Sequence, residues 1–345
     1  MLTIVLYMSL GNIKYSFIIP VKAINDYVRE SVPKILEIDR NDFEIIIYPD
    51  KATDENWPKT RQVSSGPGGP AMKRDLSVRD AHGDFLIFID DDAYPEKNIL
   101  DVLDRDFEDL SIAVIGGPAL TPKSDNFQQK VSGAFFLSFV SGGFPERYRP
   151  IGRKRFVFDW PSVNLSVRKS VFLKLGGFQA EYWPGEDTKF CLDIVNKLKE
   201  RNKILYDPEI IVWHHRRSGL FRHLKQVGSY GLHRGYFAKI YPETSFKPKY
   251  FIPSLFVLFV IISVIFFLIY PYQDEKLIYF LDLILIGWLT YITALITAFF
   301  QIYKFEKNAL VSIYALFYTF LSHLVYGIKF IQGYMFTKKL HSKLR

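Results

Sequence analysis

An apolar run from Phe85 to Ile89 leads directly into three consecutive aspartates, Asp90, Asp91 and Asp92. The run has the length and the β-forming residues of a buried strand. Neighbouring carboxylates repel one another and raise one another's pKa values, and a divalent cation with oxygen ligands removes that cost. Because ligands of open α/β sheets bind beyond the carboxyl ends of the strands, the triplet predicts a metal site at a substrate crevice. The triplet alone leaves a solvated acidic turn as the alternative.

The part of the chain before residue 245 alternates between short apolar runs and helix-forming segments. Tyr15 to Val21 and Phe43 to Tyr48 are two further strand candidates. Asn25 or Asp26 can cap a helix that continues to Leu36. Strands that alternate with helices predict an α/β domain with a largely parallel sheet.

The C-terminal third contains three long apolar segments. Residues 251–270 have no charged side chain, residues 277–300 have one acid, Asp282, and residues 309–328 include His323. Each segment has about the 20 residues that a membrane helix needs. Three buried core helices in a row are the weaker alternative, so we expect three membrane spans.

Composition therefore divides the chain into an α/β domain over residues 1–245 and a membrane region over residues 246–345. Lysines flank the three segments at Lys247, Lys249, Lys304, Lys307, Lys338 and Lys339. The first four place the large domain in the cytoplasm by the positive-inside rule, as part of a multi-pass protein of the cell membrane. The last two conflict with three full crossings. Either the third segment lies partly in the membrane interface or the tail is an exception.

The charge balance limits the classes of partner. The net charge is +8, but no long Lys/Arg block carries it. This pattern suits anionic ligands or lipid headgroups, and no zinc-finger, RRM or basic-helix pattern is present, so we expect no nucleic-acid partner. The single cysteine, Cys191, excludes an internal disulfide and a cysteine-rich metal site.

Several motifs follow one another in a set order. They are Phe17–Val21, Asp50, Ala81–Asp84, Asp90–Asp92, Gly116–Pro118, Asn164–Arg168, Gly176–Phe178 and Gly185–Asp187. Their order and spacing resemble the family 2 glycosyltransferases with a GT-A fold. The resemblance implies a Rossmann-like mixed sheet flanked by helices, with the membrane helices after it. It also implies a nucleotide-diphosphate sugar donor, Mn²⁺ or Mg²⁺ as cofactor, and a role in cell envelope polysaccharide biosynthesis.

The metal ligands follow from the same resemblance. Asp90 and Asp92 match the outer acids of the family's DXD pattern, with Asp91 in the middle position. We expect Asp92 to bind the metal directly and Asp90 to act through the ribose or a water. Several GT-A enzymes use a late histidine as a ligand, which favours His214. The adjacent His215 would point to the opposite face of its strand, and either histidine could be the one that reaches the metal.

Donor-binding residues are expected along the same strand ends. Besides Asp90 and Asp91 they are Pro20, Val21, Asp50, Arg74, Asn164 and Arg168. Pro20, Val21 and Asp50 would lie near the base, and Arg74 would neutralise phosphate. Where the family usually has Asp-Asp-Gly-Ser, this chain has Pro49-Asp50-Lys51-Ala52, which weakens the assignment of Asp50. An ordinary turn acid and, for Lys73 and Arg74, a solvated helix face are the alternatives.

Glu186 and Asp187 resemble the acidic pair that precedes the catalytic helix of the family. An inverting transfer needs one base to take the proton of the acceptor hydroxyl as it attacks. We expect Asp187 to be that base and Glu186 to orient it, although spacing does not separate the two. An acidic helix N-terminus stabilised by the helix dipole is the alternative.

Processive members of the family carry Gln-x-x-Arg-Trp, whereas this chain has Gln226 without the Arg-Trp pair. We therefore expect a membrane-anchored, metal-dependent, inverting and non-processive glycosyltransferase that acts on a lipid-linked or glycan acceptor. A nucleotidyltransferase or a non-catalytic membrane scaffold with the same fold are the alternatives. The sequence leaves the donor sugar and base, the acceptor, the number of crossings and the oligomeric state open.

Overall fold

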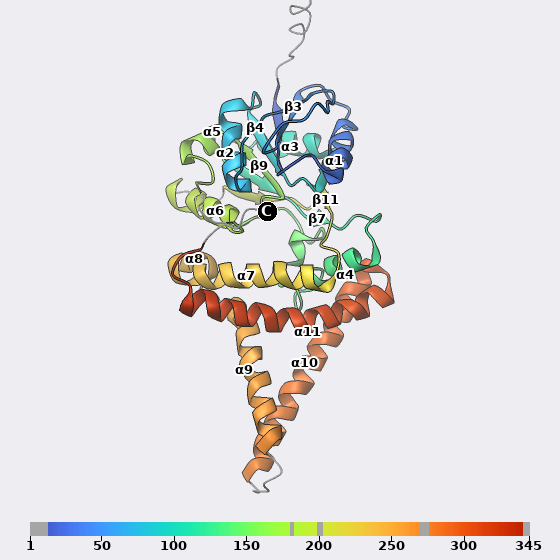
Figure 1. Cartoon of the computed structure of the whole chain (residues 1–345), viewed down its shortest axis with the longest axis vertical. Coiled ribbons are helices and arrows are strands. Elements are labelled where there is room, and N and C mark those ends of the chain that lie inside the picture. The colour runs from blue at the N-terminus through green and yellow to red at the C-terminus, as the bar shows by residue number, and fades with distance from the viewer. Residues whose placement is uncertain (1–12, 180–182, 199–202, 270–275, 341–345) are drawn as a thin grey trace, which may run out of the picture. The chain divides into compact units, whose positions relative to one another are not determined.

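The computed structural model describes most of the chain (Figure 1). The described residues are 13–179, 183–198, 203–269 and 276–340. The end of the first expected span, at residue 270, lies outside them.

The described residues form two compact units that each combine distant parts of the sequence. The first unit contains the residues up to Pro122 together with Arg149–His215, and the second contains Lys123–Tyr148 together with Arg216–Leu340. The division follows contacts and runs differently from the sequence-based boundary at residue 245, which stays a prediction.

An eight-stranded mixed sheet forms the centre of the first unit. Its strands, in spatial order, are β3 (Thr60–Gln62), β2 (Phe43–Tyr48), β1 (Tyr15–Pro20), β4 (Phe85–Ile89), β9 (Asn164–Arg168), β6 (Val114–Gly116), β10 (Ile204–Tyr206) and β8 (Arg155–Phe156). β1 pairs in parallel with β2 and β4, and β9 runs antiparallel to both β4 and β6. This is the α/β architecture with a mixed sheet that the sequence resemblance implied.

Helices cover both faces of this sheet (Figure 1). They are α1 (Asp26–Leu36), α2 (Pro70–Asp80), α3 (Ile99–Phe107), α5 (Lys169–Leu175) and α6 (Glu186–Lys197). Because strand side chains alternate between faces, Phe17 and Ile19 of β1 pack with α1 and α3, whereas Ile18 packs with α2, α5 and α6. β1 is thus buried on both faces, which explains its continuous apolar sequence.

Of the two candidate caps for α1, Asn25 is the N-cap. Its side-chain oxygen accepts a hydrogen bond from the Val28 amide at 2.9 Å. The helix ends at Leu36, as the sequence predicted.

A second, three-stranded sheet lies within the same unit. It consists of β5 (Ala93–Pro95), β11 (Val212–His214) and β7 (Ala119–Leu120). β11 runs antiparallel to β5, so that His214 lies opposite Ala93 and beside the aspartate triplet. Gly117 precedes β7 at a point of close approach, where a Cβ would lie 1.8 Å from the carbonyl oxygen of Ile210. Through this small sheet, β11, which lies late in the sequence, comes next to the end of β4.

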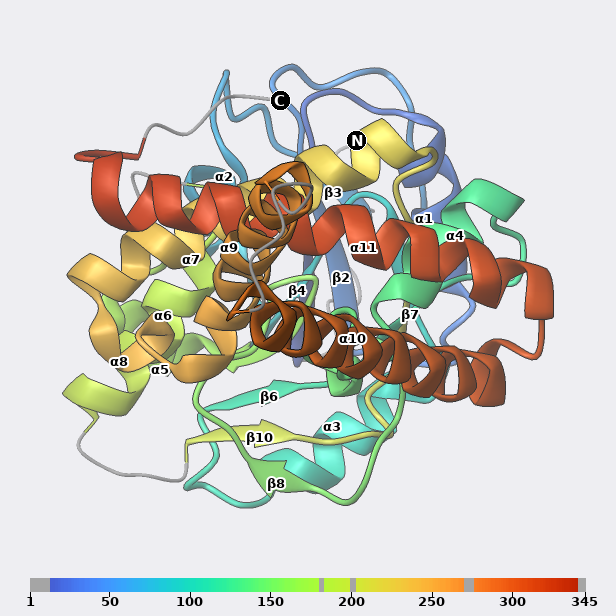
Figure 2. The ribbon, with the colours of Figure 1, turned by 90° about the horizontal axis from the view of Figure 1, so that it is seen from below.

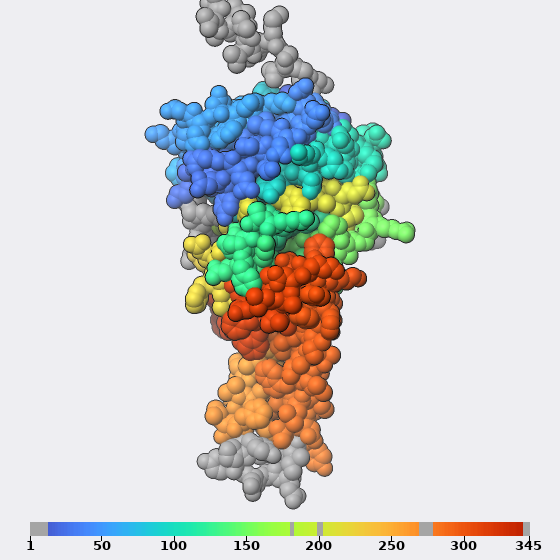
Figure 3. Space-filling model, turned by 90° about the vertical axis from the view of Figure 1, so that its right-hand side faces the viewer, coloured from blue at the N-terminus to red at the C-terminus, as the bar shows by residue number. Residues whose placement is uncertain are grey.

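The second unit is helical in its described residues. Its elements are α4 (Phe127–Phe135), the 3₁₀ turn η2 (Pro145–Arg147), α7 (Leu220–Ile240), α8 (Pro242–Ser245), α9 (Pro248–Ile269), α10 (Lys276–Glu306), α11 (Ala309–Ile331) and the π-helical turn η4 (Gln332–Phe336). Three of them, α9, α10 and the helix that begins at Ala309, are long and apolar enough to cross a membrane. Figures 2 and 3 show α9 and α10 side by side as a hairpin.

A buried histidine joins three helices of the second unit. The Nδ1 atom of His223 on α7 lies 2.8 Å from the hydroxyl of Ser132 on α4, and its Nε2 atom lies 3.0 Å from the hydroxyl of Ser322 on α11. Phe135 and Tyr318 flank the ring. Burial lowers the pKa of His223 to about 3, so the ring is neutral near pH 7, with one nitrogen as donor and the other as acceptor.

The second unit is expected to lose stability as the pH falls below about 6.5. The unfolded histidine binds a proton there, whereas the folded His223 does so only near pH 3. Between pH 7.5 and pH 5 this single group removes about 2 kcal/mol of unfolding free energy. Thermal unfolding of the purified protein at both pH values measures the loss.

The matched variants are His223→Gln and His82→Gln, the second at an exposed histidine of the first unit. His223→Gln should flatten the pH dependence, although burial also lowers the pKa of His233 and adds to the slope. His82→Gln should leave the slope as in the native protein. An unchanged slope in His223→Gln would show that this ring is not the titrating group.

Candidate active site

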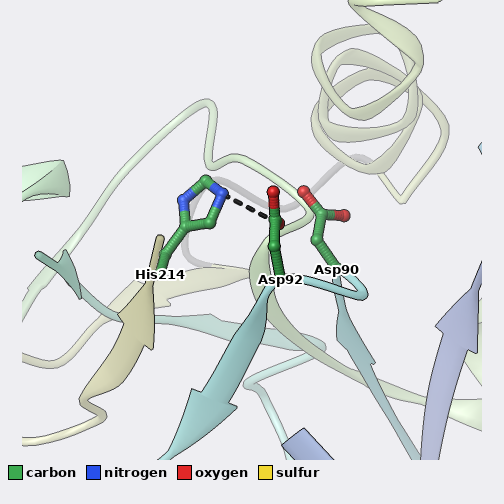
Figure 4. A group of neighbouring side chains, drawn as sticks. All are labelled: Asp90, Asp92 and His214. Atoms are coloured by element: carbon green, nitrogen blue, oxygen red, sulfur yellow. Dashed lines mark ion pairs between the residues drawn. The ribbon is translucent and has the colours of Figure 1, made fainter. Parts of the chain in front are cut away.

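The aspartate triplet forms the turn between β4 and β5. The turn is closed by a hydrogen bond from the Ala93 amide to the carbonyl oxygen of Asp90, at 3.1 Å. The side chains of Asp90 and Asp92 point into the same space (Figure 4). Asp91 points elsewhere, and its carboxylate accepts a hydrogen bond from the Asn25 amide group at 2.7 Å. Asn25 thus connects the start of α1 to the middle of the triplet.

His214 completes this group of side chains. Its Nε2 atom lies 3.2 Å from Oδ1 of Asp92, and one ligand atom from each of Asp90, Asp92 and His214 lies within 4.8 Å of the other two (Figure 4). His215 is directed to α1, where its Nε2 atom lies 3.3 Å from a carboxylate oxygen of Glu30. Two carboxylates and an imidazole are donors that a divalent metal ion accepts, so these three residues could hold a metal.

Arg74 connects the triplet to the second acidic pair. Its side chain is only 2% exposed. One terminal nitrogen donates to Asp90 at 2.5 Å, and the other donates to Glu186 at 2.9 Å. A buried guanidinium that contacts two carboxylates fixes the position of both. The solvated helix face that the sequence left open for Lys73 and Arg74 is therefore wrong, since both side chains are buried.

The acidic pair stands at the start of α6. Gly185 precedes it with φ of +111°, a conformation that favours glycine. Burial raises the pKa of Glu186 to about 8, and the neighbouring Asp187 carboxylate adds to the rise, while Arg74 opposes it. Asp187 is half-buried, and its carboxylate accepts hydrogen bonds from the amides of Ser162 at 3.2 Å and Thr188 at 2.7 Å. Of the two acids, Glu186 is buried and Asp187 is only half-buried.

Lys73 joins the carboxyl ends of β1 and β2. β1 ends at Pro20, and the Lys73 ammonium donates to the carbonyl oxygens of Val21 at 2.7 Å and Tyr48 at 3.3 Å. It also forms an ion pair with the carboxylate of Asp50. The structure therefore brings the three residues expected near the base to one corner of the sheet.

Asn164 and Arg168 lie at opposite ends of β9. Asn164 pairs with Ile89, next to the triplet, and its side-chain amide donates to the carbonyl oxygens of Pro118 at 3.2 Å and Ile210 at 2.8 Å. Arg168 pairs with Phe85, at the far end of β4. Four residues of a strand span about 13 Å.

The guanidinium of Arg168 forms its hydrogen bonds at the far end of the sheet, away from the triplet. It donates to the carbonyl oxygens of Ile112 at 2.7 Å and Phe107 at 2.6 Å. Burial lowers its pKa. The structure does not bring Arg168 to the triplet, so its position contradicts the expected phosphate contact.

Sequence reasoning missed two further contacts around the site. Asn25 was recognised only as a helix cap, yet it also holds Asp91. Asp75, next to Arg74 on α2, accepts hydrogen bonds from the amides of Phe178 at 2.7 Å and Gln179 at 3.3 Å. The three consecutive charged residues 73–75 were a signal that α2 could have a role at the site. Their partners are distant in the sequence, and no spacing pattern predicts which residues they contact.

A mixed sheet with acids beyond the end of a central strand, and an acidic pair at a later helix start, is the arrangement that the resemblance to the GT-A fold implied. Among solved structures, the mannosyltransferase PcManGT from Pyrobaculum calidifontis, in complex with GDP-Man and Mn²⁺, has this fold. It aligns with a TM-score of 0.53 over 89% of this chain and 86% of its own chain, at 14% sequence identity. The likeness shows the fold.

Part of the sequence matches a family model. Residues 16–172 match the model of glycosyl transferase family 2. The dolichyl N-acetyl-alpha-D-glucosaminyl phosphate 3-beta-D-2,3-diacetamido-2,3-dideoxy-beta-D-glucuronosyltransferase of Methanococcus voltae is 24% identical over 233 residues, which are 62% of this chain and 68% of the relative. The poly(ribitol-phosphate) beta-N-acetylglucosaminyltransferase TarS of Staphylococcus aureus is 27% identical over 100 residues, which are 25% of this chain and only 18% of TarS.

Arg74→Ala is expected to destabilise the first unit, because it removes the buried guanidinium that neutralises Asp90 and donates to the buried Glu186 side chain. Breaking a buried ion pair by removing one partner costs about 3–5 kcal/mol. Thermal unfolding should show a fall in melting temperature of many degrees. Arg74→Lys should fall between the native protein and Arg74→Ala, since it keeps the charge but not the two-pronged geometry.

Two comparisons separate this effect from a general loss of charge on α2. Arg79→Ala removes an exposed arginine of the same helix and should leave the melting temperature nearly unchanged. Adding Glu186→Gln to Arg74→Ala should recover part of the loss, because a glutamine at this buried position cannot carry a negative charge. If Arg74→Ala melts like Arg79→Ala, the bridge does not stabilise the fold.

Proposed function

We propose that the protein is a membrane-anchored, metal-dependent, inverting and non-processive glycosyltransferase. It transfers one sugar from a nucleotide-diphosphate donor to a lipid-linked or glycan acceptor. The observation that carries this proposal is the connection of the Asp90, Asp92 and His214 group to the acidic pair through Arg74. Metal ligands and a candidate base are thereby held in one fixed arrangement.

The donor would bind along the carboxyl ends of β1, β2 and β4. Val21, Asp50 and Lys73 form the corner assigned to the base. A divalent cation held by Asp92, His214 and Asp90 would neutralise charge on the diphosphate as it leaves. A set with an imidazole besides two carboxylates favours Mn²⁺ over Mg²⁺. The Pyrobaculum mannosyltransferase was solved with Mn²⁺ and GDP-Man, which supports this choice.

Asp187 is the proposed base. The acceptor hydroxyl oxygen attacks the anomeric carbon from the face opposite the diphosphate, and its proton passes to the Asp187 carboxylate. The bond from the anomeric carbon to the diphosphate oxygen breaks, and its electron pair stays on the nucleoside diphosphate, so the configuration inverts. Glu186 is enclosed with Arg74 and has a raised pKa, which suits a positioning role. The exposure of Asp187 supports the choice between the two acids.

A membrane anchor would raise the local concentration of a lipid-linked acceptor. Three helices are long and apolar enough to span a bilayer. The Methanococcus relative is named for a dolichyl phosphate-linked sugar acceptor, which supports an acceptor of this kind. The large domain would then work at the cytoplasmic leaflet. The missing Arg-Trp pair after Gln226 supports transfer of a single sugar.

Asp187→Asn and Asp92→Asn should fail in different ways. Asp187→Asn removes the base, so turnover should fall by about 10²–10⁴-fold while binding of the nucleotide persists. Asp92→Asn removes a metal ligand, so it should weaken the rise in melting temperature that UDP or GDP gives together with Mn²⁺. Released nucleoside diphosphate measures turnover, and thermal shift measures binding.

Asp26→Asn is the matched control, because the Asp26 side chain is fully exposed on α1. It should change neither turnover nor the rise in melting temperature that the nucleotide gives with Mn²⁺. Full activity in Asp187→Asn would exclude this residue as the base. An undiminished Mn²⁺-dependent shift in Asp92→Asn would exclude the proposed metal site.

A further inference from the structure

We infer that the chain crosses the membrane twice, through α9 and α10, and that α11 lies flat in the membrane interface against α4 and α7. The lipid surface is thus the partner of the outward face of α11. The inference rests on the membrane anchoring in the proposed function and is independent of the transfer reaction.

α9 and α10 form a hairpin and meet through aromatic side chains (Figure 1). At one end the rings of Phe256 and Tyr291 stack with centroids 4.2 Å apart. Towards the other end Phe266 meets Phe280 at 5.3 Å. Large apolar side chains of both helices remain exposed between these points. This is the surface expected of two antiparallel helices that cross a bilayer together.

α11 also packs against α4 and α7. In Figure 1 it runs beside α7, and Figure 2 shows it passing behind the hairpin. Two glycines of α7 let the backbones approach closely: a Cβ on Gly231 would lie 2.6 Å from the carbonyl oxygen of Tyr326, and a Cβ on Gly235 would lie 2.1 Å from that of Phe330. Residue numbers rise together along both helices, so they run parallel in one layer.

The first half of α11 packs on α4. Val311, Ala315 and Tyr318 share an apolar cluster with Val131 and Ala134 of that helix. Together, α4 and α7 therefore accompany α11 from its beginning to its end.

These two companions are too polar to enter the hydrocarbon. α7 contains Arg222, Lys225, Arg234 and Lys239, and α4 contains Gln128, Gln129 and Lys130. Each charge at the centre of a bilayer is unfavourable by about 2.5–3.5 kcal/mol on insertion scales. α11 cannot cross without taking α7 with it, so the layer that the three helices form stays at the surface.

The two faces of α11 differ as an interfacial position requires. The face towards α4 and α7 buries Ser312, Thr319 and Ser322. Another face exposes Leu310, Ile313, Phe317 and Ile328. Their spacings of three, four and eleven residues place these apolar side chains on one stripe of the helix. Such a stripe can enter the boundary between headgroups and acyl chains while the helix lies in the plane.

α9 passes α11 near its own beginning. The hydroxyl of Ser254 donates to the carbonyl oxygen of Gly327 at 3.0 Å, and a Cβ on Gly327 would lie 2.3 Å from the carbonyl oxygen of Pro253. The contact lies in the second turn of a helix that begins at Pro248. α11 therefore marks the level at which α9 would enter the bilayer.

Two crossings also remove the conflict in the charge distribution. Lys247 and Lys249 lie at the start of α9, Lys304 and Lys307 lie at the end of α10, and Lys338 and Lys339 follow α11. With α11 in the interface, all six fall on one side of the membrane. Between Ile269 and Leu277 the sequence has one lysine, Lys276, beside Asp274 and Glu275. This arrangement follows the positive-inside rule without an exception.

Single cysteines test the number of crossings. Gln273→Cys, Lys304→Cys and Lys338→Cys are each made in the full chain, and each is exposed to a membrane-impermeant maleimide in intact and in lysed cells. The native Cys191 is buried, and the parent protein measures its background. We expect Gln273→Cys to label from one side, and Lys304→Cys and Lys338→Cys to label together from the other.

Labelling of Lys338→Cys from the same side as Gln273→Cys would establish three crossings and overturn the inference. Extraction of the native protein by alkaline carbonate, with no sidedness at any position, would instead refute the membrane anchoring of the proposed function. The two failures are therefore distinguishable, and neither depends on activity.

A charge placed on each helix tests the depth of α11. Phe317 of α11 and Leu289 of α10 are both exposed, at 54% and 64%. Phe317→Lys should stay in the carbonate-washed membrane fraction at the native level, because a lysine in the interface reaches water. Leu289→Lys should reduce that fraction several-fold. An equal loss in both variants would contradict the interfacial position.

Discussion

The contacts of Arg74 with Asp90 and Glu186 are the interaction on which the arrangement of the site depends. The end of β4 and the start of α6 each carry adjacent acids, and without a cation between them these groups would repel one another. Arginine suits this position, because its guanidinium stays protonated and presents donors in a rigid fork. Its rigidity also separates the roles of the acidic pair: one acid is enclosed with the guanidinium, and the other remains accessible.

Topology decides which residues meet around this arginine. β9 runs antiparallel between β4 and β6, so its first residue, rather than its last, lies beside the aspartate turn. The small sheet then returns the chain to the same place, since β11 pairs with β5 and sets His214 next to Asp92. On the neighbouring strands, Lys73 joins the ends of β1 and β2. Each of these contacts joins parts of the chain that only the order of the strands brings together.

Sequence reasoning succeeded where the signal is local. The strand before the aspartates, the cap of α1 and the start of α6 each follow from a few consecutive residues. The alternation of side chains predicted that only one of the two adjacent histidines would reach the metal site, and His214 and His215 do point to different partners. Arg168 was misplaced because a strand's direction cannot be read from its residues, and reversing the strand moves its ends by its full length. Lys73 and Asp50 could not be paired from sequence either, because their contact depends on where α2 crosses the sheet.

The membrane region shows why average hydropathy does not settle how a helix is placed. α11 matches a membrane span in length and composition because the residues on its inner face are small, such as Ser312 and Ser322, rather than charged. Small residues allow the close helix contacts that α7 makes with its glycines, and the same residues leave the mean apolar character high. What distinguishes an interfacial helix from a crossing one is the polarity of the helices that accompany it. The lysines after α11 already indicated this in the sequence. They lie on the same side of the bilayer as the other flanking lysines only if α11 does not cross it.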